Sequence, residues 1–385
     1  MDKIKRFLEC HIATETCNLR CHYCYIAQQR KFNNKVAKFD QSPETIKKAF
    51  SKERLGGTCM INLCAGGETL IASDIVPVIR AMLEAGHYLM VVTNGTLTKR
   101  FEEIAKFPKE LLNRLFFKFS FHYLEFKRLN CMDKFFNNVR MMRDAGCSFT
   151  VEATPSDELI PYIDDMKKVC LENVGAICHV TVARNERTLD IEPLTGYSWE
   201  EYKEIWSVFD SPLFDFKYSI FNQPRKEFCY AGEWSMYIDL PSGKMRQCYC
   251  GLSMGNIFDN LDKPVKFLPI GHGCGQPHCY NGHAFLGFGN IPEYETPTYA
   301  DMRNRVCEDG SEWLKPDMKN FMCQKAENDN HVYTDCEKKK FKKYMIPIRI
   351  SELPYHVIHT LRPVVNRIKK PDINKKSDTE TKSEK

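Results

Sequence analysis

Three cysteines stand close together near the start of the chain, at Cys17, Cys21 and Cys24. Their C-x3-C-x2-C spacing suits a short loop around one metal centre. Thiolates are the usual ligands of iron–sulfur clusters, and a [4Fe–4S] cube normally takes four of them. With three thiolates and no fourth nearby, one iron would stay open to a ligand from outside the protein. The alternative is structural zinc, which usually uses C-x2-C pairs or histidines at set spacing, and His22 inside the loop is poorly placed for it.

Apolar runs alternate with amphipathic stretches along the first half of the chain. Short, nearly continuous apolar runs are typical of strands buried on both faces. Ser42 followed by Pro43 predicts a helix start, because serine caps the first turn and proline fits the first helical position. We expect strands at residues 6–14, 60–64, 88–92, 116–122, 148–154 and 177–184. We expect helices at residues 42–54, 73–85, 99–107, 109–115, 133–145 and 157–172.

Six strands separated by helices predict an α/β fold with a parallel sheet that is covered on both faces. Right-handed crossovers would curl this sheet into a partial (β/α)6 TIM-like barrel, with function at the carboxyl ends of the strands. Polar residues gather at those ends, although composition alone does not require it. They are the cysteine loop, Gly66-Gly67-Glu68, Thr93-Asn94-Gly95, Ser120 to His122, Glu152 with Thr154, and Arg184, in strand order.

Together these motifs resemble those of the radical S-adenosylmethionine (SAM) enzymes, over roughly residues 6–185. The resemblance implies that Cys17, Cys21 and Cys24 hold a [4Fe–4S] cluster, whose open iron is chelated by the amino and carboxylate groups of SAM. It also implies that Tyr23 packs by the adenine, that Gly66 and Gly67 let the backbone approach the methionine, that Glu68 receives its ammonium, and that Asn94 and Ser120 contact the ribose and the methionine end. His122, Glu152 and Arg184 are further candidates for contact with SAM or substrate.

Each strand-end motif also has an ordinary structural explanation. Gly-Gly-Glu is a common turn, Asn94-Gly95 is a common turn pair, and a serine or histidine at a strand end often only completes local hydrogen bonds. Their order behind the cysteine triplet favours a SAM site. In enzymes of this family an electron from the cluster cleaves SAM to methionine and a 5′-deoxyadenosyl radical, which abstracts hydrogen from a substrate. The resemblance therefore also implies an electron donor of the flavodoxin or ferredoxin type.

A second cysteine-rich region begins near residue 222, where the α/β alternation stops. Residues 234–239 alternate like a strand, and Pro241 to Lys244 predicts a hairpin turn. Residues 245–248 would then form the second strand of the hairpin. Cys229 and Cys248 would then meet at the base of the hairpin. Their C-x13-G-x4-C pattern resembles the opening of the SPASM and twitch extensions, which hold auxiliary [4Fe–4S] clusters, although the dense cysteine run that continues a full SPASM domain is absent from this sequence.

We therefore expect one auxiliary [4Fe–4S] cluster in this region, with Cys250 as a possible substitute ligand. Its expected ligands are Cys229, Cys248, Cys274 and Cys279. Zinc is an alternative for the second loop, with sulfur and nitrogen ligands from Cys274, His278, Cys279 and His283. A second auxiliary cluster built from the scattered late cysteines, Cys307, Cys323 and Cys336, is a further alternative. Isolated cysteines elsewhere fall in apolar surroundings and are expected to be small core residues.

Charge is distributed unevenly along the chain. Residues 338–385 carry 14 Lys or Arg and 5 Asp or Glu, whereas the net charge of the whole chain is +5, so the remainder is mildly acidic. An acidic body argues against nucleic-acid binding. The basic tail has an interrupted amphipathic pattern at residues 346–368, consistent with weak peripheral membrane contact or a solvated segment, and residues 369–385 have a composition typical of disorder.

Three regions are expected: a barrel at residues 1–221, the cysteine-rich region at residues 222–337 and the tail at residues 338–385. The aromatic, proline-punctuated segment at residues 291–299 is expected to cover the barrel mouth. No apolar run approaches the roughly 20 residues needed to cross a bilayer. No signal-like segment precedes the first strand either, so we expect a cytoplasmic protein.

The favoured function is hydrogen abstraction from a peptide or protein side chain, because extensions of this kind are most often found in enzymes that modify peptides. The short stretch before the first strand leaves no room for a leader-peptide-binding domain, which favours carbohydrate or small-metabolite modification as the nearest alternative. A different class, a non-catalytic iron–sulfur or zinc protein, would have no need of Glu68 and the other strand-end polar residues.

Overall fold

The computed structural model describes residues 2–187 and 191–350. The chain divides into two compact units, Met1–Val332 and Tyr333–Lys385, so the boundary expected at residue 221 falls inside the first unit. In the second unit, residues 335–350 are helical. The amphipathic pattern expected at residues 346–368 lies mostly outside the described residues, and the tail expected at residues 369–385 lies outside them entirely.

One nine-stranded sheet forms the centre of the first unit, in the order β11-β10-β9-β1-β2-β3-β4-β5-β6. Strands β1 to β6 are parallel to their neighbours, as the alternation of strands and helices predicts. Their carboxyl ends therefore lie along one edge. The strands are β1 Ile4–Ile12, β2 Thr58–Ala65, β3 Tyr88–Thr93, β4 Leu115–Ser120, β5 Ser148–Ala153, β6 His179–Val180, β9 Ser235–Asp239, β10 Lys244–Arg246 and β11 Ser253–Asn256, with a separate pair, β7 Arg184–Asn185 and β8 Glu192–Pro193.

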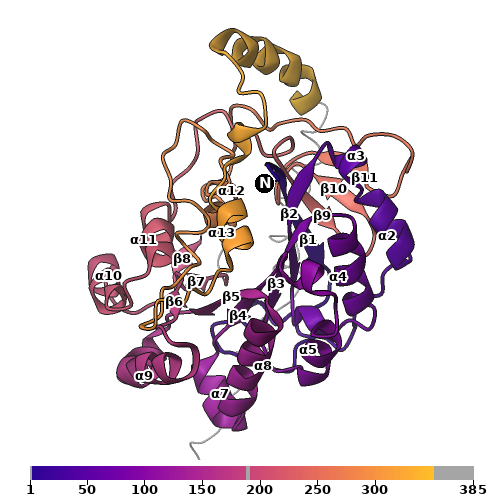
Figure 1. The fold of residues 1–385 in the computed structure, drawn as a ribbon. Coiled ribbons are helices and arrows are strands. Elements are labelled where there is room, and N and C mark those ends of the chain that lie inside the picture. Colours follow the sequence, from indigo (N-terminus) through magenta and orange to yellow (C-terminus); the bar gives the residue numbers. More distant parts are fainter. Residues whose placement is uncertain (1, 188–190, 351–385) are drawn as a thin grey trace, which may run out of the picture. The chain divides into compact units, whose positions relative to one another are not determined.

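Most of the crossover helices cover the outer face of the curved sheet (Figure 1). The α-helices of the first unit are α1 Tyr25–Gln28, α2 Pro43–Ala49, α3 Lys52–Leu55, α4 Ile75–Glu84, α5 Thr98–Ile104, α6 Lys109–Leu112, α7 Tyr123–Leu129, α8 Met132–Ala145, α9 Ile163–Val174, α10 Trp199–Ser207, α11 Pro212–Ser219, α12 Gly282–Phe285 and α13 Pro316–Met322. Short 3-10 helices are η1 Thr69–Ile71, η2 Asp157–Tyr162 and η3 Ala326–Asn328. Ser42 caps α2 as predicted, accepting the Thr45 backbone N–H at 3.2 Å.

The two faces of the sheet pack against different parts of the chain. The outer core joins residues such as Leu63 and Phe117 to the crossover helices. The inner core joins Phe7 and Met60 to the segments around α12 and α13, which lie inside the curve of the sheet (Figure 1). The cysteine-rich region therefore fills the inner side of the partial barrel at the amino-terminal half of its strands.

The hairpin predicted around Pro241 forms, with β9 and β10 antiparallel and β11 continuing the pattern. Strand β9 also pairs parallel with β1, from Phe7 opposite Ser235 to His11 opposite Asp239. This long-range pairing adds the hairpin to the barrel sheet beside the strand that leads to the cysteine triplet. Local patterns give no sign of it.

Three expectations about individual segments are corrected. The helix expected at residues 42–54 is broken at residues 50–51 into α2 and α3. The sixth strand, expected at residues 177–184, is only His179–Val180. The segment expected to cover the mouth instead places Tyr299 in the inner core, where its hydroxyl donates to the Met90 sulfur at 3.1 Å.

Candidate active site and metal centres

The cysteine triplet lies in the loop directly after β1. Its backbone is tightened by the Cys24 N–H, which donates to the Cys21 carbonyl at 3.1 Å, and by the Leu19 N–H, which approaches the Cys17 sulfur at 3.4 Å. Burial raises the pKa of the Cys17 thiol to about 11 and also raises the pKa of Cys21, and neighbouring thiols add to both shifts. Such thiols ionise readily only beside a strong positive charge, which a metal centre supplies. The donor set therefore fits an iron–sulfur cluster.

The Gly-Gly-Glu loop after β2 lies against the chain that leads into this triplet. The Gly67 N–H donates to the Thr14 carbonyl at 2.6 Å, and the Glu68 N–H donates to the Thr16 carbonyl at 2.9 Å. A Cβ on Gly67 would stand 2.0 Å from the Thr16 carbonyl oxygen, and one on Gly66 would stand 2.8 Å from the Thr14 oxygen. The two glycines thus permit a backbone contact within the protein, in addition to the approach to methionine that the sequence predicts.

Glu68 is 2% exposed and connects three segments. Its carboxylate accepts the Leu70 N–H at 2.9 Å, the Thr93 hydroxyl at 2.7 Å and the Asn94 N–H at 2.8 Å. Burial raises its pKa, and the same three donors oppose the rise. A carboxylate has about four acceptor positions, so one position remains for a further donor such as the predicted ammonium group.

Glu68→Gln is expected to weaken this connection. In the wild-type protein, N–H and O–H donors surround both carboxylate oxygens of Glu68. The glutamine NH2 group would replace one of these oxygens and leave buried donors without an acceptor, at a cost of about 1–3 kcal/mol. The variant should lose that much unfolding free energy in denaturant titration, and it should cleave SAM more slowly. Glu84→Gln is the matched control, because Glu84 makes only surface ion pairs with Arg80 and Lys47. Equal stabilities of the two variants would contradict the role given to Glu68.

Asn94 links the end of β3 to the cysteine loop. Its amide nitrogen donates to the Asn18 carbonyl oxygen at 2.8 Å and lies 3.8 Å from the Cys17 sulfur. Its own carbonyl oxygen accepts the Thr96 N–H at 3.1 Å, and the Asn18 amide donates to the Thr96 hydroxyl at 2.8 Å. Sequence reasoning named Asn94 but missed Asn18 and Thr96, because no spacing rule links two loops far apart in the chain.

Tyr23 pairs with His122, the residue before α7. The Tyr23 hydroxyl lies 2.6 Å from the His122 Nδ1, and the two rings are stacked with centroids 5.9 Å apart. Burial lowers the pKa of His122 to about 4, so the ring is neutral near neutral pH. His122 therefore orients the Tyr23 ring, which the family resemblance implies would pack by the adenine. Ser120, at the end of β4, pairs in register with Glu152 on β5, and Arg184 forms an ion pair with Glu186 at 2.9 Å.

Five cysteines from the second region line a single pocket on the inner side of the sheet. They are Cys229, Cys248, Cys250, Cys274 and Cys279, with His278 beside them. The Cys250 side chain hydrogen-bonds to both Cys248 and Cys274, and the Cys248 sulfur and burial raise its pKa to about 12. The structure thus brings the four expected ligands together and adds the expected substitute. This sulfur-rich donor set fits an iron–sulfur cluster.

The zinc alternative requires His278 and His283 to join two of these cysteines. The His278 Nδ1 accepts the Asn222 N–H at 3.1 Å. The charges that act on His283 are Lys217, Arg303, Lys118 and Arg184, whereas those that act on Cys279 include Cys229 and Cys274. His283 thus faces a set of cations and Cys279 faces the thiols. In the described part of the chain, no three His, Cys, Asp or Glu side chains are grouped around the position of a single metal ion.

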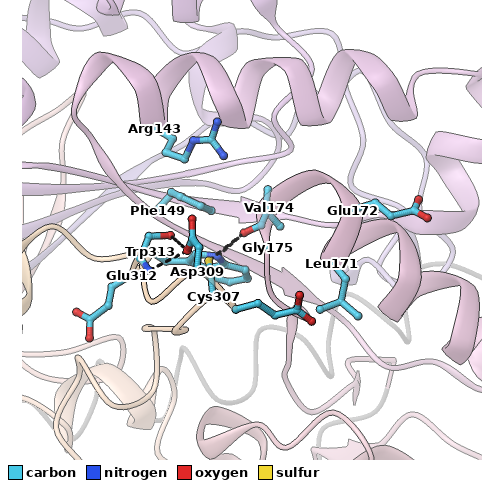
Figure 2. A pocket seen from close by; sticks show the side chains of 12 residues that line it. Arg143, Phe149, Leu171, Glu172, Val174, Gly175, Cys307, Asp309, Glu312 and Trp313 are labelled. Carbon is cyan, nitrogen blue, oxygen red and sulfur yellow. Dashed lines mark hydrogen bonds between the residues drawn. The ribbon is translucent and has the colours of Figure 1, made fainter.

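The late cysteines are dispersed. Cys307 lines a surface cavity of about 480 Å³ near the start of β5, where its sulfur lies 3.4 Å from the Val174 carbonyl beside Trp313 and Phe149 (Figure 2). Cys323 is exposed just after α13, and Cys336 belongs to the second unit. The cavity of Figure 2 is at the amino-terminal end of β5 and contains none of the residues expected to bind SAM.

The fold and the thiol loop define the class of protein: an α/β partial barrel with a cysteine site at the carboxyl ends of its strands. Residues 12–154 match the family model of the radical SAM superfamily. This part of the chain matches a radical SAM domain, whose family binds SAM and a [4Fe–4S] cluster.

No curated protein matches the chain. Among solved structures, SuiB of Streptococcus suis is similar at 17% identity over 69% of this chain and 66% of SuiB, with a TM-score of 0.46, so the chain spans slightly less than two thirds of SuiB. The structure titled native anSMEcpe with bound AdoMet is similar at 16% identity over 90% of this chain and 98% of that one, with a TM-score of 0.47. Among the described residues, no helix is long and apolar enough to cross a membrane.

Proposed function

We propose that this chain is a radical SAM enzyme in which Cys17, Cys21 and Cys24 hold the [4Fe–4S] cluster and SAM binds beside it at the carboxyl ends of β1 to β4. When bound, the cluster and SAM would supply a 5′-deoxyadenosyl radical for hydrogen abstraction. The observation that carries this assignment is the contact between the Gly-Gly-Glu loop and the chain entering the triplet, with Gly67 at 2.6 Å from the Thr14 carbonyl.

The chain's own residues have separate tasks in this proposal. Gly66 and Gly67 hold the second loop against the first. Glu68 and Asn94 fix the relative positions of β2, β3 and the cysteine loop through the bonds described above, and Glu68 keeps an acceptor position for the methionine ammonium. His122 sets the orientation of Tyr23 beside the adenine. Ser120 is the last of these residues. It lies at the end of β4, next to the inner face where a substrate would lie.

We further propose one auxiliary [4Fe–4S] cluster in the five-cysteine pocket, with Cys250 as a substitute ligand. Its ligands are Cys229, Cys248, Cys274 and Cys279. The pocket adjoins the inner core that fills the barrel. Extensions that resemble this one occur mostly in enzymes that modify peptides. A peptide or protein side chain is therefore the first substrate class, with an external electron donor of the flavodoxin or ferredoxin type.

The test is anaerobic reconstitution of the full chain, followed by dithionite and SAM. We expect 5′-deoxyadenosine together with about eight irons per chain, because each [4Fe–4S] cluster contributes four. Cys279→Ser should lower iron to about four per chain and retain the electron paramagnetic resonance signal that changes when SAM is added. Wild-type protein that binds iron but never yields the nucleoside would refute the proposed function. Wild-type protein with only about four irons would refute the auxiliary cluster alone.

A further inference from the structure

Glu152 on β5 is surrounded by positive charge on the inner face of the barrel. Its carboxylate lies 3.0 Å from the Lys118 ammonium and accepts a hydrogen bond from the Arg303 guanidinium. Lys217 on α11 acts on the same carboxylate. Glu152 is 7% exposed and Arg303 is 0% exposed, so one buried carboxylate faces three basic side chains. We call Lys118, Lys217 and Arg303 the Glu152 cation cluster.

Hydrogen-bond donors in this cluster remain without acceptors. The Nε and Nη2 atoms of Arg303 are buried donors that have no hydrogen-bond partner among the described residues. Buried polar groups are nearly always paired, and an unmet donor on a charged group is especially costly. A guanidinium also presents its donors in a fixed fork that matches the oxygens of a carboxylate or phosphate. The unmet donors therefore point to an absent oxyanion.

The ionisation of neighbouring groups agrees with an excess of positive charge. Burial, against the opposing charge of Glu152 and together with the charges of Lys118, Arg184 and Arg303, lowers the pKa of Lys217 to about 7. Burial and the same set of cations hold the pKa of His283 well below its usual value. Without an anion, the lowered pKa values of Lys217 and His283 favour their neutral forms, which reduces the positive charge. An anion bound here would raise both pKa values.

The cluster lies just inside the strand ends that carry the SAM residues. Lys118 is two residues before Ser120 on β4, and Ser120 is in register with Glu152 on β5. Lys118 keeps 16% of its side chain exposed, so the Lys118 side of the cluster contacts solvent. Any ligand held here would therefore stand next to the place where the radical is expected.

We propose that Lys118, Lys217 and Arg303 bind an oxyanion group of the substrate, a carboxylate or a phosphate, and hold the substrate at the inner face beside SAM. The naming of this ligand as substrate rests on the proposed function. The anion site itself does not, because it is defined by the buried donors and charges alone.

The test measures anion binding to the iron-loaded full chain without SAM, using glutarate and inorganic phosphate as separate probes. Each probe is titrated while the melting temperature is followed, since a ligand that binds only the folded state raises it. We expect a saturable rise with at least one probe, and the stronger probe identifies the oxyanion. Lys217→Met should weaken binding about tenfold or more, the loss of one charge-assisted hydrogen bond.

A structural role for the cluster predicts a different pattern. If Lys217 only braces the fold, Lys217→Met lowers the melting temperature without a probe and leaves the probe-induced rise unchanged. The proposal expects loss of the rise and at most a small change without a probe. The substitution removes the hydrogen bond of Lys217 to Thr181 and its attraction to Glu152, but it also removes its repulsion from Lys118, Arg184 and Arg303. Lys47→Met is the matched control, because Lys47 pairs with Glu84 at the surface. No rise in wild-type protein, or an undiminished rise in Lys217→Met, would overturn the anion site, whereas absence of 5′-deoxyadenosine would overturn only its assignment to a radical substrate.

Discussion

Cys21→Ala is expected to abolish SAM cleavage and to lower iron from about eight to about four per chain after anaerobic reconstitution. Cys21 is 5% exposed in the loop after β1, and its thiol has a pKa raised first by burial and then by the charges of Cys24 and Glu125. Alanine removes the sulfur with little change in volume. The two remaining thiols of the triplet cannot hold a cube that needs a thiolate on each of three irons.

The loss should be confined to one site. The residues that line the five-cysteine pocket do not include any cysteine of the triplet, so the remaining iron should keep a cluster absorption spectrum. Cys323→Ser is the control, because Cys323 is exposed just after α13 and should change neither iron nor activity. Retained formation of 5′-deoxyadenosine in Cys21→Ala would contradict the ligand assignment, and loss of all iron would contradict the presence of two independent sites.

The barrel and the cysteine triplet could be predicted because their signals are local. Continuous apolar runs such as residues 88–92 and 148–154 mark buried strands, and the observed strands Tyr88–Thr93 and Ser148–Ala153 differ from them by a residue or so. The capping of α2 by Ser42 depends on a side chain and a backbone group three residues apart. Parallel strands then place every strand-end motif along one edge without further information.

The rest depends on contacts between distant parts of the chain. The ion pair of Glu152 with Arg303 joins β5 to a segment 151 residues away. The sequence analysis named Glu152, but no local pattern links it to Lys118, Lys217 or Arg303. The parallel pairing of β9 with β1 likewise joins segments that share no pattern. Such pairings follow from the packing of whole layers, which single-sequence periodicity does not encode.

The auxiliary site combines a feature that local sequence predicts with one that depends on contacts between distant segments. The hairpin that brings Cys229 toward Cys248 follows from an alternating strand and a turn, and the structure forms it with β9 and β10. The placement of Cys250 against both Cys248 and Cys274 depends on how the later loop folds back, which no spacing rule provides. The sequence therefore predicted four ligands and a substitute, and the structure brings all five cysteines to one pocket without distinguishing the substitute from the four.

Gly67→Ala tests the contact on which the proposed site depends. The new Cβ would lie 2.0 Å from the Thr16 carbonyl oxygen and 2.5 Å from its carbon, and a backbone carbonyl cannot move aside as a flexible side chain can. Overpacking of this kind costs typically 1–3 kcal/mol, and a backbone clash lies at or above the upper end. Because Thr16 directly precedes Cys17, relief of the clash would displace the triplet. We expect a lower melting temperature, iron reduced by about half and no SAM cleavage.

Two further glycines make this a graded series. A Cβ on Gly66 would lie 2.8 Å from the Thr14 carbonyl oxygen, so Gly66→Ala should have an intermediate effect. A Cβ on Gly196 would meet nothing closer than the Asp157 carboxylate at 3.6 Å, an ordinary contact, so Gly196→Ala should behave as wild type. If Gly67→Ala kept its iron and activity, the Gly-Gly-Glu loop would not position the cysteines. Its glycines would then serve only the approach of a ligand, and a normal melting temperature with weaker SAM binding would show it.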